Sequence, residues 1–249
     1  MRAGLVEASL ERDGSVAQFF VVPTGPAVGD LLVALGFQPK EGHFVRSFLD
    51  ADDVPRIFQN FAAHIDEVIR YKNRETPTPW EHALEVAAKR LTGKVDWWLS
   101  GSAALAIRGV DSHPRDIDLI VDDAQLTGRL LNDILIEPVT RMHGWVAEWF
   151  GRAFDQALIE WVADVRADTT AGPREDGPAA AVRRERVVWR GHEILCSPLD
   201  LQLAVCEARG LTGQAEAIRR FMSHLGQSSD TLAPGHLYGA GAGEGREVR

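Results

Sequence analysis

Hydrophobic residues in the first third of the chain switch between strand-like and helix-like spacing. Short apolar runs predict strands at 17–22 and 43–48, and periodic apolar positions predict helices at 28–37 and 53–72. A polar stretch with two prolines, 74–79, follows and is typical of a boundary. We therefore expect residues 1–75 to form a small N-terminal α+β lobe, whose function the pattern does not reveal.

Residues 76–196 carry a second set of elements. Thr78 as N-cap, Pro79 at N1 and Glu81 at N3 predict the start of a helix, because these residue types satisfy free backbone groups there. Beyond this helix we expect a strand and short helix within 96–109, a strand at 116–121, a strand within 153–165 and a hairpin at 186–195. The polar segment 167–181 reads as a loop.

The C-terminal part is predicted to be helical and then disordered. Ser197 as N-cap and Pro198 at N1 predict a helix that opens a helical segment over 197–226. The glycine-rich residues 227–249 are typical of a disordered tail. Taken together, the elements predict an α+β fold in which a mixed sheet is flanked by helices.

Two aspartates stand inside the apolar strand predicted at 116–121. Asp116 and Asp118 would point to the same face, about 6–7 Å apart along the strand. Neighbouring carboxylates repel each other unless a cation neutralises them, and Mg²⁺ prefers such oxygen ligands. The alternative is an exposed edge strand whose aspartates are solvated.

A Gly-Ser turn precedes these aspartates. Gly101 and Ser102 follow an apolar strand and open a short helix, so free backbone N–H groups and the Ser102 hydroxyl could bind a phosphate. Taken alone, the turn is more typical of an ordinary strand–turn–helix junction in which Ser102 is the N-cap.

The two features together resemble a known family. Gly101-Ser102, thirteen residues, then Asp116-Ile117-Asp118 is similar to the pattern of the nucleotidyltransferase superfamily related to DNA polymerase β. Its small bacterial members include the minimal, AbiEii-type and antibiotic nucleotidyltransferases. The resemblance covers roughly 80–225. It implies a polymerase-β-like core, nucleotide binding by Gly101 and Ser102, and Mg²⁺ binding by Asp116 and Asp118.

The family usually has a third acid on a later strand, and here two candidates compete. Alternation places Glu160 and Asp164 on one face about 13 Å apart, too far to serve one metal site together. We favour Glu160, because a charge in mid-strand most needs a partner, whereas Asp164 adjoins a polar loop. As third acid, Glu160 would bind a metal ion or accept the proton of the attacking hydroxyl.

Two arginines are candidate nucleotide contacts with open alternatives. Arg115 could reach a phosphate or pair with a nearby carboxylate, and Arg209 could contact the triphosphate or simply complement a helix C-terminus. Arg108 reads as structural. We expect Asp122 to cap the helix that follows the paired aspartates.

Three tryptophans lie near the proposed site in sequence. A stacking wall for a ligand is conceivable, but burial in the core is the better interpretation of these residues: Trp145, Trp149 and Trp161.

Composition and charge limit the classes of partner molecule that the protein is expected to bind. The net charge of −9 argues against a broad nucleic-acid surface, although the loop arginines, Arg174, Arg183, Arg184 and Arg186, would favour RNA if they clustered. Two cysteines fit a reducing cytosol. Neither a signal peptide nor a membrane span is apparent, so we expect a cytoplasmic protein.

The leading hypothesis is nucleotidyl transfer with two Mg²⁺ ions. A nucleoside triphosphate (NTP) would donate its NMP group to an acceptor hydroxyl, with Asp116, Asp118 and Glu160 binding the ions. The acidic balance favours a small acceptor, such as an aminoglycoside-like cation. The alternatives are a toxin-type enzyme acting on tRNA or protein, and an inactive nucleotide-binding or interaction module. The oligomeric state is left open.

Overall fold

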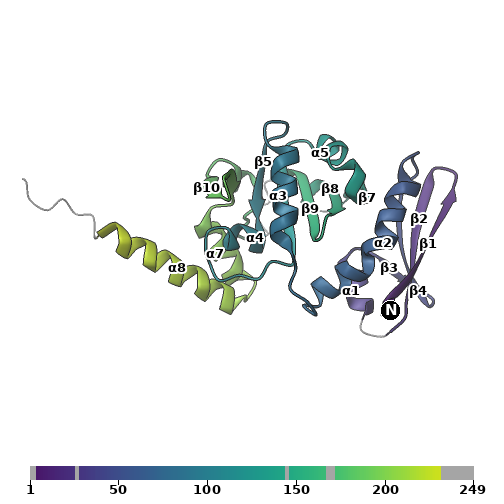
Figure 1. Cartoon of the computed structure of the whole chain (residues 1–249), viewed down its shortest axis with the longest axis horizontal. Helices are drawn as coiled ribbons and strands as arrows, with labels where there is room; N and C mark the ends of the chain where they lie inside the picture. Colours follow the sequence, from purple (N-terminus) through teal and green to yellow (C-terminus); the bar gives the residue numbers. More distant parts are fainter. Residues whose placement is uncertain (1–3, 26–27, 144–145, 167–171, 231–249) are drawn as a thin grey trace, which may run out of the picture.

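The structure is a computed structural model that describes residues 4–25, 28–143, 146–166 and 172–230. Its N-terminal part is an antiparallel sheet with two helices (Figure 1). The strands, in spatial order, are β1 (Val6–Asp13), β2 (Val16–Pro23), β4 (His43–Leu49) and β3 (Gln38–Lys40), and the helices are α1 (Gly29–Ala34) and α2 (Val54–Lys72). The expected strands and helices are therefore present, and β1 and β3 are additional.

Helix α2 links the two parts of the molecule. Its apolar positions recur at helical spacing, and six of them, Val54, Ile57, Phe61, Ile65, Val68 and Ile69, are buried. The helix packs against β1 of the N-terminal sheet and also against β7 (Leu135–Arg141) of the larger sheet (Figure 1). One apolar core consequently extends through both parts of the chain.

The larger sheet has seven strands in the order β10-β11-β5-β6-β9-β8-β7. The pairs β11/β5 and β6/β9 are parallel and the others are antiparallel, so the sheet is mixed, as expected. Besides β7, its strands are β5 (Trp97–Ser100), β6 (Asp116–Val121), β8 (Ala147–Phe154), β9 (Leu158–Val165), β10 (Glu185–Trp189) and β11 (His192–Cys196). The segment 153–165 contains the end of β8, a turn and β9, rather than one strand.

Helices flank this sheet, which confirms the predicted fold class. They are α3 (Trp80–Leu91), α4 (Gly101–Ala106), α5 (Ala124–Leu130), α6 (Pro178–Ala181), α7 (Leu199–Ala208) and α8 (Thr212–Asp230), with a 3-10 turn at Asn132–Ile134. The α4 and α5 helices follow β5 and β6 directly, which places their N-termini at the ends of neighbouring strands.

Three predicted helix caps were wrong. The N-cap residues of α3 and α7 are Pro79 and Pro198, and neither makes a side-chain hydrogen bond. Both helices therefore begin one residue later than predicted. The cap of α5 is Asp123, whose carboxylate accepts from the backbone N–H of Leu126. Asp122 accepts instead from the N–H of Asp96, which fastens the start of β5 to the end of β6.

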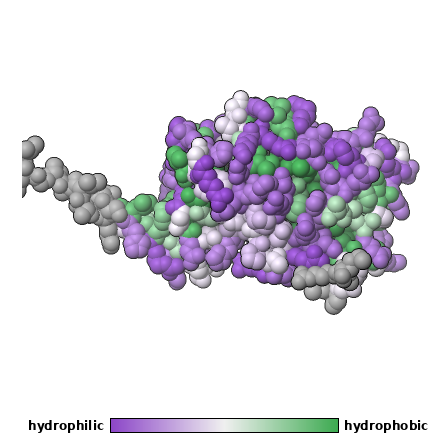
Figure 2. All heavy atoms as spheres, viewed as in Figure 1, coloured by the Kyte–Doolittle hydropathy of each residue, from purple (hydrophilic) through white to green (hydrophobic). Residues whose placement is uncertain are grey.

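The α8 helix extends away from the sheet (Figure 1) and runs to Asp230. The helical segment expected to end at residue 226 is therefore longer, and the rest of the expected disordered tail, residues 231–249, lies outside the described part of the chain. No helix in the described ranges is long and apolar enough to cross a membrane. Hydrophilic residues cover most of the face drawn in Figure 2.

Candidate metal and nucleotide site

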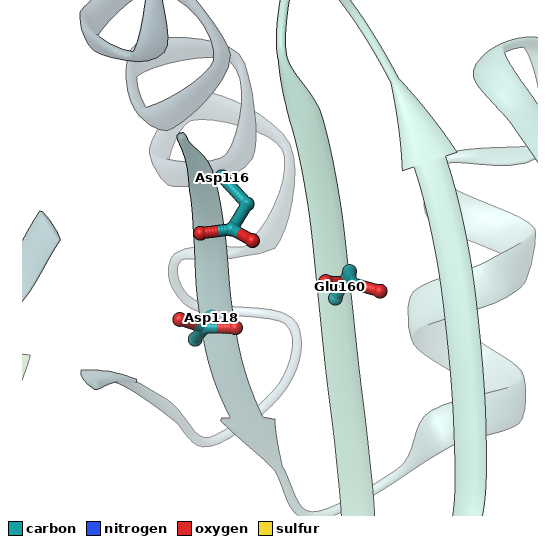
Figure 3. Close-up of side chains that lie close together, drawn as sticks. All are labelled: Asp116, Asp118 and Glu160. Carbon is teal, nitrogen blue, oxygen red and sulfur yellow. The ribbon is translucent and has the colours of Figure 1, made fainter. Parts of the chain in front are cut away.

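Three carboxylates meet on the two parallel strands β6 and β9. Asp118 is the register partner of Glu160, and Asp116 lies two residues earlier on β6, on the same face (Figure 3). One carboxylate oxygen from each of the three lies within 4.8 Å of the other two. We call Asp116, Asp118 and Glu160 the acidic triad.

Strand alternation explains this placement. Ile117 and Leu119 on β6 and Ile159 and Trp161 on β9 are buried on the opposite face of the sheet. Their burial fixes which face the acids occupy, because slipping a strand by one residue would move every side chain to the other face.

Lys72, the last residue of α2, lies among the three acids. Its ammonium group bonds to Oδ2 of Asp116 and lies 3.2 Å from Oε2 of Glu160. The side chain is 18% exposed. A cation from the N-terminal part therefore offsets part of the triad's charge, which helps these carboxylates to be tolerated in a mainly apolar sheet.

Glu160 has a second cationic partner on β8. Nε of Arg152 donates to Oε1 of Glu160 at 2.7 Å, and Nη1 of Arg152 donates to Oε1 of Glu137 at 2.7 Å. Arg46 of β4 also pairs with Glu137, at 3.1 Å. Charges of alternating sign thus run from the N-terminal sheet into the triad.

These neighbours set the ionisation of the site. Burial, together with the charges of Asp116 and Glu160, raises the pKa of Asp118 well above its usual value. Burial also acts to raise the pKa of Glu160, but Arg152 and Lys72 outweigh it and lower that pKa to about 2. Glu160 is therefore an anion at neutral pH, which suits a metal ligand better than a proton acceptor.

The predicted Gly-Ser turn stands directly beside the triad. Gly101 has φ +63°, and a β-carbon there would lie 2.3 Å from Oδ2 of Asp118. Only glycine allows both the left-handed backbone and this approach to Asp118. The turn is thereby joined to the aspartate strand in space as well as in sequence.

A carboxylate already accepts a hydrogen bond from the backbone N–H of Gly101. Oε2 of Glu175 accepts from the N–H of Gly101 at 3.2 Å and from Nε2 of Gln202 at 2.8 Å. Gln202 is buried, and its Nε2 also donates to the carbonyl of Gly101. An anion can therefore be held at this turn, and in this structure the anion is Glu175.

One pocket of about 350 Å³ is lined by two members of the triad, Asp118 and Glu160, and by Glu175. Its polar lining contains Gly101, Asp118, Glu160, Glu175, Asp176 and Arg209, and Phe150 contributes an aromatic ring. Four carboxylates against one guanidinium make this pocket acidic. Arg209, the C-cap residue of α7, also lines this pocket.

The other two predicted nucleotide contacts line a different pocket. Ser102 and Arg115, with Arg74 and His113, surround a volume of about 350 Å³. Nη1 of Arg115 donates to the carbonyl of Lys72 at 3.2 Å, a backbone contact in place of the salt bridge considered above. The four predicted nucleotide contacts are thus divided: Gly101 and Arg209 line the acidic pocket, and Ser102 and Arg115 line the more basic one.

The remaining candidates lie away from the site or support the fold. Asp164 is exposed with φ +53°, which interrupts the alternation near the end of β9. Trp161 is fully buried, and its Nε1 donates to the carbonyl of Ala124, as expected of core. Trp149 is half-buried and packs under Arg141, while Trp145 lies outside the described residues.

The loop arginines are each engaged with an acid. The pairs are Arg174 with Asp176, Arg183 with Asp200, Arg184 with Asp96 and Arg186 with Glu193. A neighbouring carboxylate thus offsets the charge of each of these arginines, which weakens the case for an RNA partner. Arg108 is structural, as expected: it donates to the carbonyls of Ala104 and Ser197 and pairs with Glu185.

Sequence reasoning missed three charged residues at the site: Lys72, Arg152 and Glu175. Lys72 resembles any cation at a helix C-terminus. Arg152 lies in the apolar run "WFGRAF", and the reasoning that selected Glu160 for its mid-strand charge would have found it. Glu175 lies in a polar loop, where nothing distinguishes it.

The triad fits a hard divalent cation. All three donors are carboxylate oxygens, the ligands that Mg²⁺ prefers, and they already lie within 4.8 Å of one another on one face of the sheet. Oε1 of Glu160 is engaged by Arg152, so Oε2 is the oxygen free to face a metal, once Lys72 has moved. An acidic triad beside a glycine turn that holds an anion is the set of groups that a metal–phosphate complex requires.

The chain is similar in structure to two nucleotidyl-transfer proteins. A protein of Thermotoga maritima assigned as a nucleotidyltransferase has 23% identity and a TM-score of 0.46, over 58% of this chain and 93% of its own. The antibiotic-resistance factor ANT(2″)-Ia in solution has 16% identity and a TM-score of 0.36, over 62% of this chain and 87% of its own. Crystalline ANT(2″)-Ia with adenylyl-2″-tobramycin has 16% identity and a TM-score of 0.28, over 57% and 94%. Neither a family model nor a curated protein matches the chain.

Proposed function

We propose that this protein is a Mg²⁺-dependent nucleotidyltransferase that moves an NMP group from an NTP to an acceptor hydroxyl. One observation carries the proposal: oxygens of Asp116, Asp118 and Glu160 lie within 4.8 Å of one another, beside a glycine turn that already holds a carboxylate. The residues of this chain, rather than its structural similarities, support the assignment.

Each residue has a part in the transfer. Two Mg²⁺ ions bound by the acidic triad would activate the acceptor hydroxyl and stabilise charge on the leaving pyrophosphate. The backbone of Gly101 and the side chains of Ser102, Arg115 and Arg209 would bind the triphosphate. The hydroxyl oxygen would bond to the α-phosphorus and lose its proton to solvent, while the bond from that phosphorus to pyrophosphate would break. Arg152 positions Glu160 by holding one of its oxygens.

The acceptor that fits best is a small cation. The pocket beside Asp118 and Glu160 is lined by two further carboxylates, Glu175 and Asp176. Its volume of about 350 Å³ suits a small molecule, such as an aminoglycoside-like compound. The paired loop arginines offer little to a nucleic acid, so tRNA is the weaker candidate acceptor.

The test is a transfer assay with α-labelled NTPs. The protein is incubated with MgCl₂, each of the four nucleotides, and a panel of aminoglycosides, bulk tRNA or no acceptor. We expect label on a cationic small molecule, lost in Asp116→Asn and Asp118→Asn. Label on tRNA or on the protein itself would contradict the acceptor, and no label with any partner would contradict the activity.

A second candidate is an inactive nucleotide-binding or interaction module, which Lys72 favours. The paired acids speak against such a module, because a module that only binds has no need of two repelling carboxylates. The ammonium of Lys72 bonds to Asp116 and lies 3.2 Å from Oε2 of Glu160, so part of this repulsion is offset without a metal. Nucleotide binding without transfer in the assay above would select this candidate.

A further inference from the structure

Lys72 occupies the position that a metal ion would take in the acidic triad. Its ammonium contacts Asp116 and lies 3.2 Å from Oε2 of Glu160, and these two acids supply two of the three oxygens that approach within 4.8 Å. The same lone pairs cannot be shared with a second cation at close range, because the two positive charges repel. Lysine and metal therefore compete for one place.

The placement of Lys72 is held by the surrounding structure. Lys72 ends the 19-residue helix α2, and its carbonyl accepts from Arg115, which directly precedes Asp116. Earlier in α2, Nδ2 of Asn60 donates to the carbonyls of Asp133 and Leu135 at 2.9 Å each. The helix is thus fastened to the larger sheet along its length.

We propose that Lys72 is a built-in counter-ion that a divalent metal must displace, so that the N-terminal part of the chain controls metal loading of the triad. This inference rests on the proposed metal site and gives residues 1–75 a role that the transfer reaction alone does not require. The long, flexible lysine stem allows the ammonium to leave while α2 stays packed.

Metal binding without nucleotide tests the inference directly. MnCl₂ alone is titrated into the full-length chain and followed calorimetrically and by the loss of free Mn²⁺ in electron paramagnetic resonance. Lys72→Met keeps the apolar stem and removes the charge, and we expect it to bind Mn²⁺ roughly tenfold more tightly, a usual size for coupling between two ligands. Asp116→Asn, added to Lys72→Met, should abolish the gain.

Lys94→Met is the matched control. It removes the same charge from an exposed position before β5, at the end of that strand away from Ser100, the register partner of Asp118. We expect its Mn²⁺ affinity to equal that of the wild type. Circular dichroism confirms that each variant is folded.

A second measurement uses the wild-type protein, in case Lys72→Met does not fold. Amine acetylation with limiting acetic anhydride, read out by peptide mass spectrometry, should label Lys72 slowly while it is buried against the acids. Saturating Mn²⁺ should increase its labelling severalfold and leave Lys94 unchanged.

The outcomes separate the two proposals. Equal or weaker Mn²⁺ binding by Lys72→Met, or unchanged Lys72 labelling on Mn²⁺ binding, would overturn the counter-ion role and leave the metal site standing. No Mn²⁺ binding by any variant would overturn both the counter-ion role and the metal site on which the proposed function depends.

Discussion

The α-carbon of Gly101 and the carboxylate of Asp118 are so close that a β-carbon on Gly101 would lie 2.3 Å from Oδ2. The residue that permits the turn is therefore also the residue that leaves space for the aspartate. This contact ties the expected phosphate-binding turn to the expected metal-binding strand, since neither can shift without moving the other.

Gly101→Ala should consequently damage the site as well as the fold. The added methyl group must push Asp118 aside, and the backbone at φ +63° disfavours alanine. Gly93→Ala is the matched control, because Gly93 has φ +76° and nothing within 4 Å of its would-be β-carbon. We expect the control to lose about 1–2 kcal/mol of unfolding free energy in urea titrations and Gly101→Ala about 1–3 kcal/mol more.

Manganese titration distinguishes the two variants functionally. Gly101→Ala should bind Mn²⁺ more weakly than Gly93→Ala, because only the former displaces a ligand oxygen. If both variants bind Mn²⁺ as the wild type does, the contact with Asp118 has no bearing on the metal.

Truncating the side chain of Arg152 should lower the free energy of unfolding more than most single substitutions do. Its side chain is 6% exposed and holds both Glu137 and Glu160, so Arg152→Met leaves two buried carboxylates short of a partner. We expect a loss of about 3–5 kcal/mol of unfolding free energy, measured in urea. Arg141→Met, which breaks the pair between Arg141 (58% exposed) and Glu148, should cost no more than about 1 kcal/mol. Similar costs for the two variants would show that Arg152 is dispensable to the buried network.

The sequence predicted the triad but not its partners, and the difference has a physical cause. Alternation within one strand is enough to place Asp116 and Asp118 on one face. The family resemblance implied a third acid, and the mid-strand position of Glu160 favoured it over Asp164. Arg152 meets Glu160 only through the register of β8 with β9, and Lys72 meets it only through packing of α2 on β7. Contacts of this kind depend on tertiary structure, which no local pattern encodes.

Strand β7, which the sequence pattern did not predict, has a local explanation. In β7 the apolar pattern is interrupted by Glu137 and Pro138, and the pairing with β8 shifts register between Leu135 and Thr140. Such irregular pairing removes the regular alternation on which strand prediction depends. Glu137, at this irregularity, is the acid that Arg152 and Arg46 neutralise.

The paired loop arginines lead to a prediction about RNA. Because Arg183 and Arg184 are engaged with Asp200 and Asp96, we expect only weak tRNA binding in gel shifts at 0.15 M salt. The double variant Arg183→Ala/Arg184→Ala should leave that binding unchanged. Tight binding that the double variant abolishes would revive the toxin-type alternative.

Glu175 yields a prediction about nucleotide affinity. Its carboxylate accepts from the N–H of Gly101, the place expected to receive a phosphate, so nucleotide must displace it or bind against its charge. Glu175→Gln keeps an oxygen that can accept the same hydrogen bond but removes the charge. We expect it to bind ATP or GTP about fivefold more tightly, since removing even one charge repulsion of about 1 kcal/mol has this effect.

The matched control for Glu175→Gln is Glu193→Gln, which makes the same charge change on an exposed residue of β11 paired with Arg186. Calorimetric titration with nucleotide in the absence of metal should show no gain for this control. The gain at Glu175 should shrink as salt rises from 0.05 to 0.5 M, because the repulsion is screened. Weaker nucleotide binding by Glu175→Gln would instead mean that the carboxylate serves the nucleotide, and the turn at Gly101 would then hold a group other than phosphate.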